Sequence, residues 1–210
     1  MEIKERIIIK AKELFFRYGV KSVTMDDIAN ELGISKKTIY LHFEDKDDIV
    51  FQLFQREMKE DKCEWEELHN SSKNVIDRMV KSMEVIKQAF AEVNPSTLFD
   101  IKKYHPRSWN IFQEHKEKFI LESIKRDLIE GIEQGLFRAE IKIDILARMR
   151  LEQIEMGFDP SSFSISKFTI VEVQLELLDH FIRGVLTEKG TKIYNEYQQK
   201  QTSNEKTSKR

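Results

Sequence analysis

Three lysines lie where a helix ordinarily disfavours positive charge. Lys36 and Lys37 directly follow a helix-capping serine, Ser35, and Lys46 follows a second capping residue, Asp45. Cations in a first turn oppose the helix dipole, at a cost of about 0.3–1 kcal/mol each. A phosphate backbone offsets that cost, because helix N-termini present free N–H groups to anions and the lysines add attraction. The pattern predicts a nucleic-acid contact; the alternative is that these lysines lie on an ordinary solvated face.

The residues that follow the first two lysines fit the same contact. Thr38, Tyr40 and His42 alternate with two apolar residues, Ile39 and Phe43, which we expect to point inward as anchors. Threonine and tyrosine hydroxyls bind phosphates, lysine binds guanine, and the threonine methyl contacts thymine. The segment therefore predicts one DNA-facing side and one buried side.

Strong start and stop signals define the elements that position these residues. Thr24 and Asp27 have the spacing of a capping box, and Gly33 fits as the end of the helix that they begin. We predict helices at residues 3–18, 25–32 and 36–43. Two helices joined by a turn of about three residues form a helix-turn-helix, although short helical hairpins also occur in plain bundles. The third helix is too short to be stable alone, so its neighbours must support it.

The rest of the chain is predicted to be helical as well, which makes the fold class all-α. Only three prolines and seven glycines occur among 210 residues, and that scarcity of breakers favours long helices. The expected helices cover about 46–69, 73–93, 96–104, 109–134, 144–157, 166–188 and a short stretch to 199. We expect a helix-turn-helix domain at 1–46 (motif about 24–43), an effector-binding and dimerisation domain at 47–199, and a disordered tail at 200–210, which contains no apolar residue.

The helix predicted at 166–188 carries apolar residues that point in nearly every direction. A helix that is apolar on most sides must be buried on most sides. We therefore expect a second copy of the chain to cover it, with Leu177 and Phe181 facing the partner. The alternative is burial within one subunit.

A group of aromatic residues gathers around two proline breaks, at Pro95 and Pro106. Broken helices leave gaps between rods, and aromatic side chains line apolar pockets. This predicts a site for an apolar or amphipathic small molecule, although the same residues can simply be core. The candidate ligand-binding residues are Phe90, Phe99, Tyr104, Trp109, Phe112 and Phe119.

Other classes of function find little support. No nucleophile–base pair or glycine-rich phosphate loop indicates an enzyme or a cofactor, and the five histidines lack metal-ligand spacing. No apolar run approaches the roughly 18 residues of a membrane helix, so we expect a cytoplasmic protein. Bulk charge is uninformative, since residues 1–46 carry nine basic and eight acidic residues, a net of +1.

One segment is similar to a known family. Residues Thr24 to Lys46, TMDDIANELGISKKTIYLHFEDK, resemble the TetR family of bacterial transcriptional repressors, as do Ala11–Phe15 and Tyr18–Gly19 upstream. The resemblance covers about residues 3–58. It implies that Thr24 and Lys46 hold phosphates. It also implies that the DNA-facing side is made of Lys36, Lys37, Thr38, Tyr40 and His42. Of these, Lys36 and Lys37 would be the base readers.

The resemblance further implies a homodimer that binds a double-stranded DNA operator and an unknown small-molecule effector. The leading hypothesis is a ligand-responsive dimeric regulator, most simply a repressor, that binds a palindromic operator through the helix that begins at Lys36. The alternative is a helical protein-interaction or small-molecule-binding module that has lost DNA binding.

Overall fold

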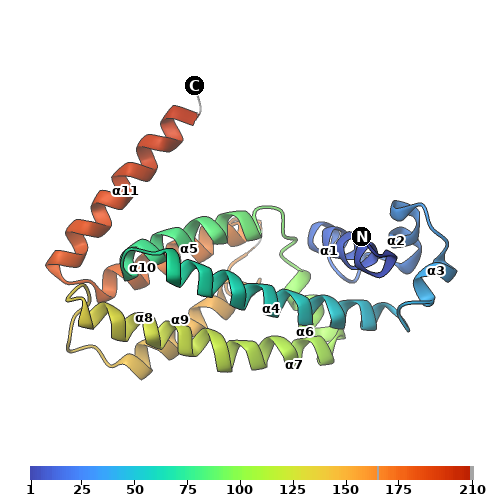
Figure 1. The fold of residues 1–210 in the computed structure, drawn as a ribbon, viewed down its shortest axis with the longest axis horizontal. Helices are drawn as coiled ribbons and strands as arrows, with labels where there is room; N and C mark the ends of the chain where they lie inside the picture. The colour runs from blue at the N-terminus through green and yellow to red at the C-terminus, as the bar shows by residue number, and fades with distance from the viewer. Residues whose placement is uncertain (165, 209–210) are drawn as a thin grey trace.

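The computed structural model of the chain describes residues 1–164 and 166–208, and within them every element is a helix apart from one isolated bridge between Phe137 and Leu186 (Figure 1). The all-α class is confirmed. The helices are α1 (Ile3–Tyr18), α2 (Met25–Leu32), α3 (Lys36–Tyr40), α4 (Lys46–Ser71), α5 (Val75–Phe90), α6 (Thr97–Tyr104), α7 (Pro106–His115), the π-helix η1 (Lys116–Ile120), α8 (Leu121–Glu133), α9 (Ile143–Met156), α10 (Ile170–Val185) and α11 (Glu188–Ser208).

Several helices differ from the sequence-based prediction in length; for example, α3 ends at Tyr40 rather than residue 43, and α5 spans Val75–Phe90 rather than 73–93. The predicted helix at 109–134 starts earlier, at Pro106, and is interrupted by η1. Proline suits a first helical position because its missing N–H has no helical partner there. The disordered tail expected at 200–210 is also a correction, because α11 continues to Ser208; residues 209–210 lie outside the described residues. Helix formers such as lysine, glutamate and glutamine extend a helix without any apolar contact.

The N-terminal core joins residues from both halves of the chain. Ile7, Phe15, Ile28 and Ile39 of α1–α3 pack with buried residues of α4, and two residues from farther along complete the cluster: Ile101 of α6 and Phe112 of α7. The predicted boundary between residues 46 and 47 is therefore not a boundary of packing, since α4, α6 and α7 all contribute to the core beneath the helix-turn-helix.

A second core lies in the C-terminal half and corrects the prediction for residues 166–188. The helix α10 begins only at Ile170, after a capping box made by Thr169 and Glu172. Phe181 is 2% exposed and packs in one cluster with apolar residues of α5, α8 and α9. Residues on the opposite face of α10, such as Glu176 and His180, are polar and exposed. The helix is thus buried on one side by its own chain, and Phe181 does not face a partner.

Candidate nucleic-acid interface and interior polar sites

The turn between α2 and α3 is fixed by local hydrogen bonds. The Thr24 hydroxyl oxygen accepts from the Asp27 amide at 3.2 Å, and the Asp27 carboxylate accepts from the Thr24 amide at 2.8 Å. At the other end, Gly33 has a φ of 63°, in the left-handed region that favours glycine. The predicted capping box and glycine stop are both confirmed, and they set the direction in which α3 leaves α2.

The short helix α3 has one buried side and one exposed side. Ile39 is fully buried and Phe43, just after the helix, is 2% exposed, while Lys36, Lys37 and Tyr40 are exposed. The Ser35 hydroxyl caps the helix by accepting from the Thr38 amide at 3.1 Å. Because the anchors point into the N-terminal core, the polar residues form the outer surface of the helix-turn-helix.

The two lysines of α3 differ in their partners. Lys36 Nζ donates to Asp26 Oδ2 at 2.7 Å, and this hydrogen bond raises the pKa of Lys36. Lys37 makes no ion pair within the described part of the chain. The carboxylate of Asp26 therefore partly neutralises Lys36 in the free protein, whereas Lys37 presents a cation that is unpaired among the described residues.

The other predicted DNA contacts are not equally accessible. Tyr40 is 49% exposed, while Thr38 and His42 are half-buried, and the Thr38 hydroxyl shares a hydrogen bond of 2.8 Å with Ser35. Sequence reasoning missed Leu41, which is 73% exposed at the end of α3. An apolar residue inside a polar run was the available signal. Leu41 extends the outer surface with a side chain suited to apolar contact with DNA.

Lys46 is held more firmly than its predicted role requires. Its Nζ donates to the Val23 carbonyl at 2.6 Å, and burial lowers the pKa of this half-buried amine. Thr24 also has an internal partner, since its hydroxyl donates to Asp27 at 2.7 Å. In the free protein these two residues fix the start of α4 against the start of α2. A phosphate contact would add to that function.

Helix α6 connects the helix-turn-helix to the rest of the chain. The Asp100 carboxylate accepts from the Lys21 amide at 3.1 Å, and the Thr97 hydroxyl donates to the Phe15 carbonyl at 3.3 Å. Just after α6, His105 Nδ1 lies 2.7 Å from an Asp47 carboxylate oxygen at the start of α4. A movement of α6 would therefore act on both α1 and α4.

The six aromatic residues predicted to bind a ligand do not meet in one pocket. Trp109 and Phe112 pack against the N-terminal core, because α7 lies along α4. Phe99 and Tyr104 are exposed. Phe90 packs edge-on against Phe158, with ring centroids 5.0 Å apart, whereas Phe119 stacks near His115 at 5.1 Å. The proline breaks turn these side chains onto different helix faces, so their closeness in sequence does not become closeness in space.

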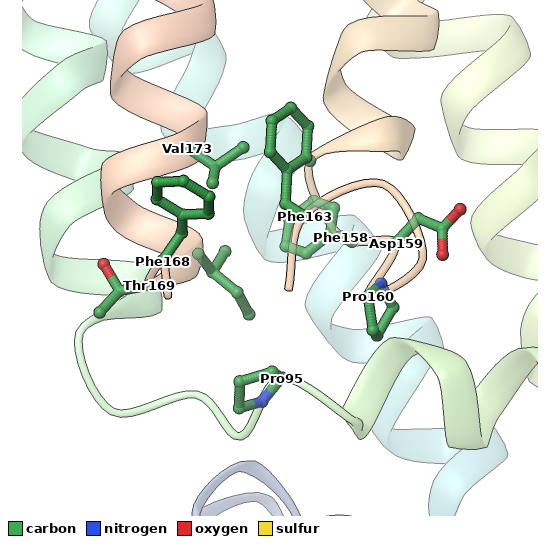
Figure 2. Close-up of a pocket in the computed structure, with 10 residues that line it drawn as sticks. Pro95, Phe158, Asp159, Pro160, Phe163, Phe168, Thr169 and Val173 are labelled. Carbon is green, nitrogen blue, oxygen red and sulfur yellow. The ribbon is translucent and has the colours of Figure 1, made fainter. Parts of the chain in front are cut away.

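A small pocket lies instead between the start of α10 and the loop before it (Figure 2). Phe158, Phe163, Phe168 and Val173 gather on one side of it, and Pro95 lies across from them. The space in it that can hold a water molecule is only about 10 Å³. A larger ligand would require the pocket to widen.

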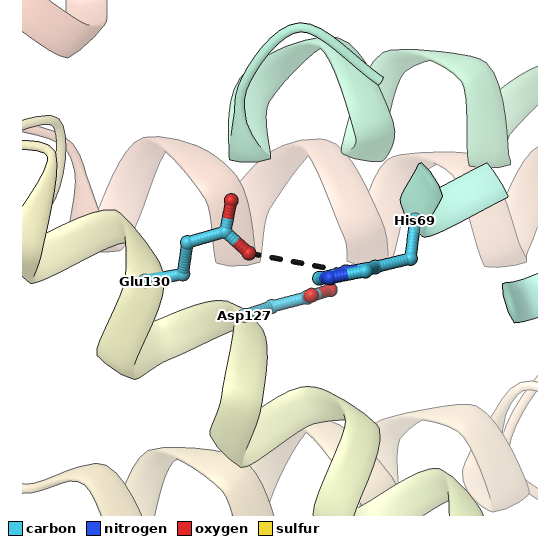
Figure 3. A group of neighbouring side chains, drawn as sticks. All are labelled: His69, Asp127 and Glu130. Carbon is cyan, nitrogen blue, oxygen red and sulfur yellow. Dashed lines mark ion pairs between the residues drawn. The ribbon is translucent and has the colours of Figure 1, made fainter. Parts of the chain in front are cut away.

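The fold brings together three residues that could bind a metal, which the sequence spacing did not indicate. One atom each from His69, Asp127 and Glu130 lies within 4.8 Å of the others (Figure 3). Arg78 occupies this group as its cation: the buried guanidinium contacts Asp127 at 2.8 Å and also pairs with Glu130. Burial raises the pKa of Asp127 to about 6, against the attraction of Arg78. The arrangement is that of a buried ion-pair network.

Within the described residues, no helix combines the length and the hydrophobicity needed to cross a bilayer.

Comparison with known proteins supports the geometry of the N-terminal region. Residues 7–53 match the family model described as bacterial regulatory proteins, tetR family. The chain is 28% identical over 186 residues to the uncharacterized HTH-type transcriptional regulator YvaF of Bacillus subtilis, covering 86% of this chain and 94% of that protein.

Solved structures of regulators share the whole fold. A TetR-family transcriptional regulator from Agrobacterium tumefaciens superposes with a TM-score of 0.72 at 16% identity, over 88% of this chain and 97% of that one. The transcriptional regulator FadR from Bacillus subtilis, in complex with stearoyl-CoA, gives a TM-score of 0.62 at 19% identity, over 86% and 98% of the two chains. At these identities the likeness extends to the fold alone.

Proposed function

We propose that this chain is a transcriptional regulator of the TetR family that works as a ligand-responsive dimeric repressor of a palindromic operator; the match of residues 7–53 to the family model and the likeness to YvaF support this. The observation that carries the DNA contact is the outer surface of α3, where Lys37 and Tyr40 are exposed above the buried anchor Ile39. This exposed surface also disfavours the alternative hypothesis, a helical module that has lost DNA binding. A repressor then acts by occupying the DNA that transcription requires.

The proposed DNA contact is tested by replacing Lys37 with alanine. We expect about 5- to 150-fold weaker binding to the preferred duplex, with reduced discrimination among duplexes of a randomised pool, because a lysine that binds a base contributes about 1–3 kcal/mol. Fluorescence anisotropy measures the affinity for each duplex, and it is repeated at several salt concentrations. For the wild type, affinity should fall steeply as salt rises.

Lys59→Ala removes the same charge from an exposed position of α4 and serves as the matched control. It should bind like the wild type. If Lys59→Ala weakens binding as much as Lys37→Ala, or if the wild type binds no member of the pool, α3 is not the DNA-reading element.

The proposed dimer interface lies on α9 rather than on α10. Ile145, Met149 and Met156 are 61%, 41% and 39% exposed, and their spacing of four and seven residues places them on one outward stripe. Three exposed apolar side chains on one face favour burial against a second copy. The two-fold symmetry of such a dimer matches the symmetry of a palindromic operator.

Met149→Glu should raise the dissociation constant of the dimer by at least tenfold, since a charge in an apolar interface loses its solvation. Analytical ultracentrifugation from nanomolar to micromolar concentration measures the change. Ile129→Glu introduces the same charge at an exposed apolar position of α8 outside this stripe and should leave the dimer intact. A monomeric wild type at micromolar concentration, or an undisturbed Met149→Glu dimer, would exclude this interface.

The proposed response to a ligand depends on α6. A ligand shifts DNA binding only if it binds one conformation better than another, and coupling free energies are typically about 1–3 kcal/mol, or roughly 5- to 150-fold in operator affinity. The Thr97 contact with Phe15 links α6 to α1, and the contact of His105 with Asp47 links the end of α6 to α4. That the related fold of FadR holds stearoyl-CoA supports a small-molecule effector here.

A further inference from the structure

Arg150 is a buried cation without an anion. It lies on α9, its side chain is almost wholly enclosed with 5% of the residue exposed, and its Nη1 atom is buried without a hydrogen-bond partner. Within the described residues no acid pairs with it. The acids on neighbouring turns of α9 are engaged elsewhere: Glu152 lies 3.6 Å from Arg148, and Glu155 pairs with Lys116.

An arginine in this position costs stability. A buried charge without a partner loses its hydration and gains no compensating attraction, and burial alone accordingly lowers the pKa of Arg150 to about 10. By contrast, Arg78 in the same half of the chain is buried with two carboxylates around it. Arg78 therefore has counter-charges within the described residues, and Arg150 has none.

A second unsatisfied polar atom lies beside the first. Gln153 is three residues after Arg150, so the two side chains share a face of α9, and its Oε1 atom is also buried without a partner. The Nη1 atom itself is buried, so a partner for this atom must enter the interior of the subunit.

The same face of α9 leads to the small pocket of Figure 2. Gly157, which lines that pocket, lies seven residues or about 10 Å along the helix from Arg150. Between them, the buried Gln174 of α10 donates from Nε2 to the Ile154 carbonyl at 2.9 Å. A Cβ added to Gly157 would come within 2.4 Å of the same Nε2 atom. Gln174 therefore fills the space between α9 and α10 beside Ile154 and Gly157.

We infer that Arg150 binds the anionic head of an amphipathic effector, whose apolar part occupies the pocket formed by Phe158, Phe163, Phe168 and Val173. The inference rests on the proposed function, because it names the chemistry of the effector. One anionic group bound to the guanidinium supplies the missing counter-charge, and a hydroxyl or amide N–H beside it satisfies Gln153 Oε1. Gln174 must move aside, which couples entry of the ligand to the packing of α10 on α9.

The test uses the full chain, the variant Arg150→Met and thermal unfolding. Without ligand, Arg150→Met should unfold at a higher temperature than the wild type, because an apolar side chain of similar length replaces an unpaired charge. With straight-chain and aromatic carboxylates of eight to fourteen carbons as probes, the wild type should be stabilised, and binding should weaken at least tenfold in Arg150→Met. The matched neutral alcohols should bind the wild type at least tenfold more weakly than the acids.

Arg148→Met makes the same change two residues away on the exposed side of α9, where Arg148 pairs with Glu117 at 2.8 Å, and should keep the response to the acids. The inference is overturned if Arg150→Met unfolds at a lower temperature, if no carboxylate shifts the wild type, or if acids stabilise both proteins equally. Operator binding without ligand distinguishes the two proposals. It should persist in Arg150→Met whatever the acids do, and its absence in the wild type would contradict the proposed function alone.

Discussion

Replacing Arg78 with methionine is expected to lower the free energy of unfolding by about 3–5 kcal/mol at pH 7.5, because it leaves the buried carboxylate of Asp127 without its cation. Arg78 is 2% exposed and contacts Asp127 through two nitrogen atoms, at 2.8 and 2.9 Å. Glu130, which pairs with the same guanidinium, would lose its partner as well. No other change of a single charge should destabilise the C-terminal half as strongly.

The loss should depend on pH in a defined direction. The pKa of Asp127 is already about 6 in the folded protein, above the value of about 3.9 for an unfolded chain. The stability that the neutral carboxyl confers is therefore fully present below about pH 4 and is lost as the pH rises through 6. Without Arg78 this pKa rises further, so Arg78→Met should lose less stability at pH 5 than at pH 7.5.

Urea unfolding at the two pH values measures this difference, with Arg148→Met as the control for an exposed pair. The control should unfold at nearly the same urea concentration as the wild type, since exposed ion pairs contribute little. Equal losses for Arg78→Met at both pH values would mean that Asp127 is charged throughout. A loss below about 1 kcal/mol would mean that the network is not buried in solution.

Ile101→Ala is expected to destabilise the helix-turn-helix by about 2–5 kcal/mol, although residue 101 lies far outside it in sequence. Ile101 is fully buried in the core that α1–α4 form. Removing its outer carbons leaves a cavity where α6 meets that core. The contacts of Asp100 with Lys21 and of Thr97 with Phe15 flank the same position and would loosen with it.

Amide hydrogen exchange distinguishes a local effect from a global one. Protection should fall in α1 and α2 of Ile101→Ala before it falls in α10, and operator binding should weaken in parallel. Ile129→Ala removes the same atoms from a side chain that is 45% exposed and lies outside the proposed dimer stripe, and it should change stability by no more than about 0.5 kcal/mol. If α1 and α2 keep their protection in Ile101→Ala, the two halves of the chain do not share a core in solution.

The helix-turn-helix was predictable because its signals are local. Thr24, Asp27, Gly33 and Ser35 each act within four residues, and the structure has each in its expected place. Burial on the inner side of α3 followed from the four-residue spacing of Ile39 and Phe43. The partners of the two lysines did not, since Asp26 lies ten residues from Lys36 and Val23 lies 23 residues from Lys46.

The packing partners in the C-terminal half could not be predicted from the sequence for a related reason. An apolar stripe shows that Phe181 is buried but not whether its own chain or a partner buries it. Arg150 carried one usable signal, because it falls on the same helical face as Ala147 and Leu151, both fully buried. Its lack of a counter-charge depends on which acids the fold brings near, and spacing along one helix does not determine that.

The wide turn of η1 gives the chain one residue more than a continuous α-helix would need between α7 and α8. His115 and Lys116, consecutive in sequence, are both buried there, one against Asp61 of α4 and the other against Glu155 of α9. Deleting a single residue from this turn would rotate α8 by about 100° relative to α7, and Asp127 would no longer face Arg78. In the evolution of such chains, gaps between α7 and α8 should therefore be rare.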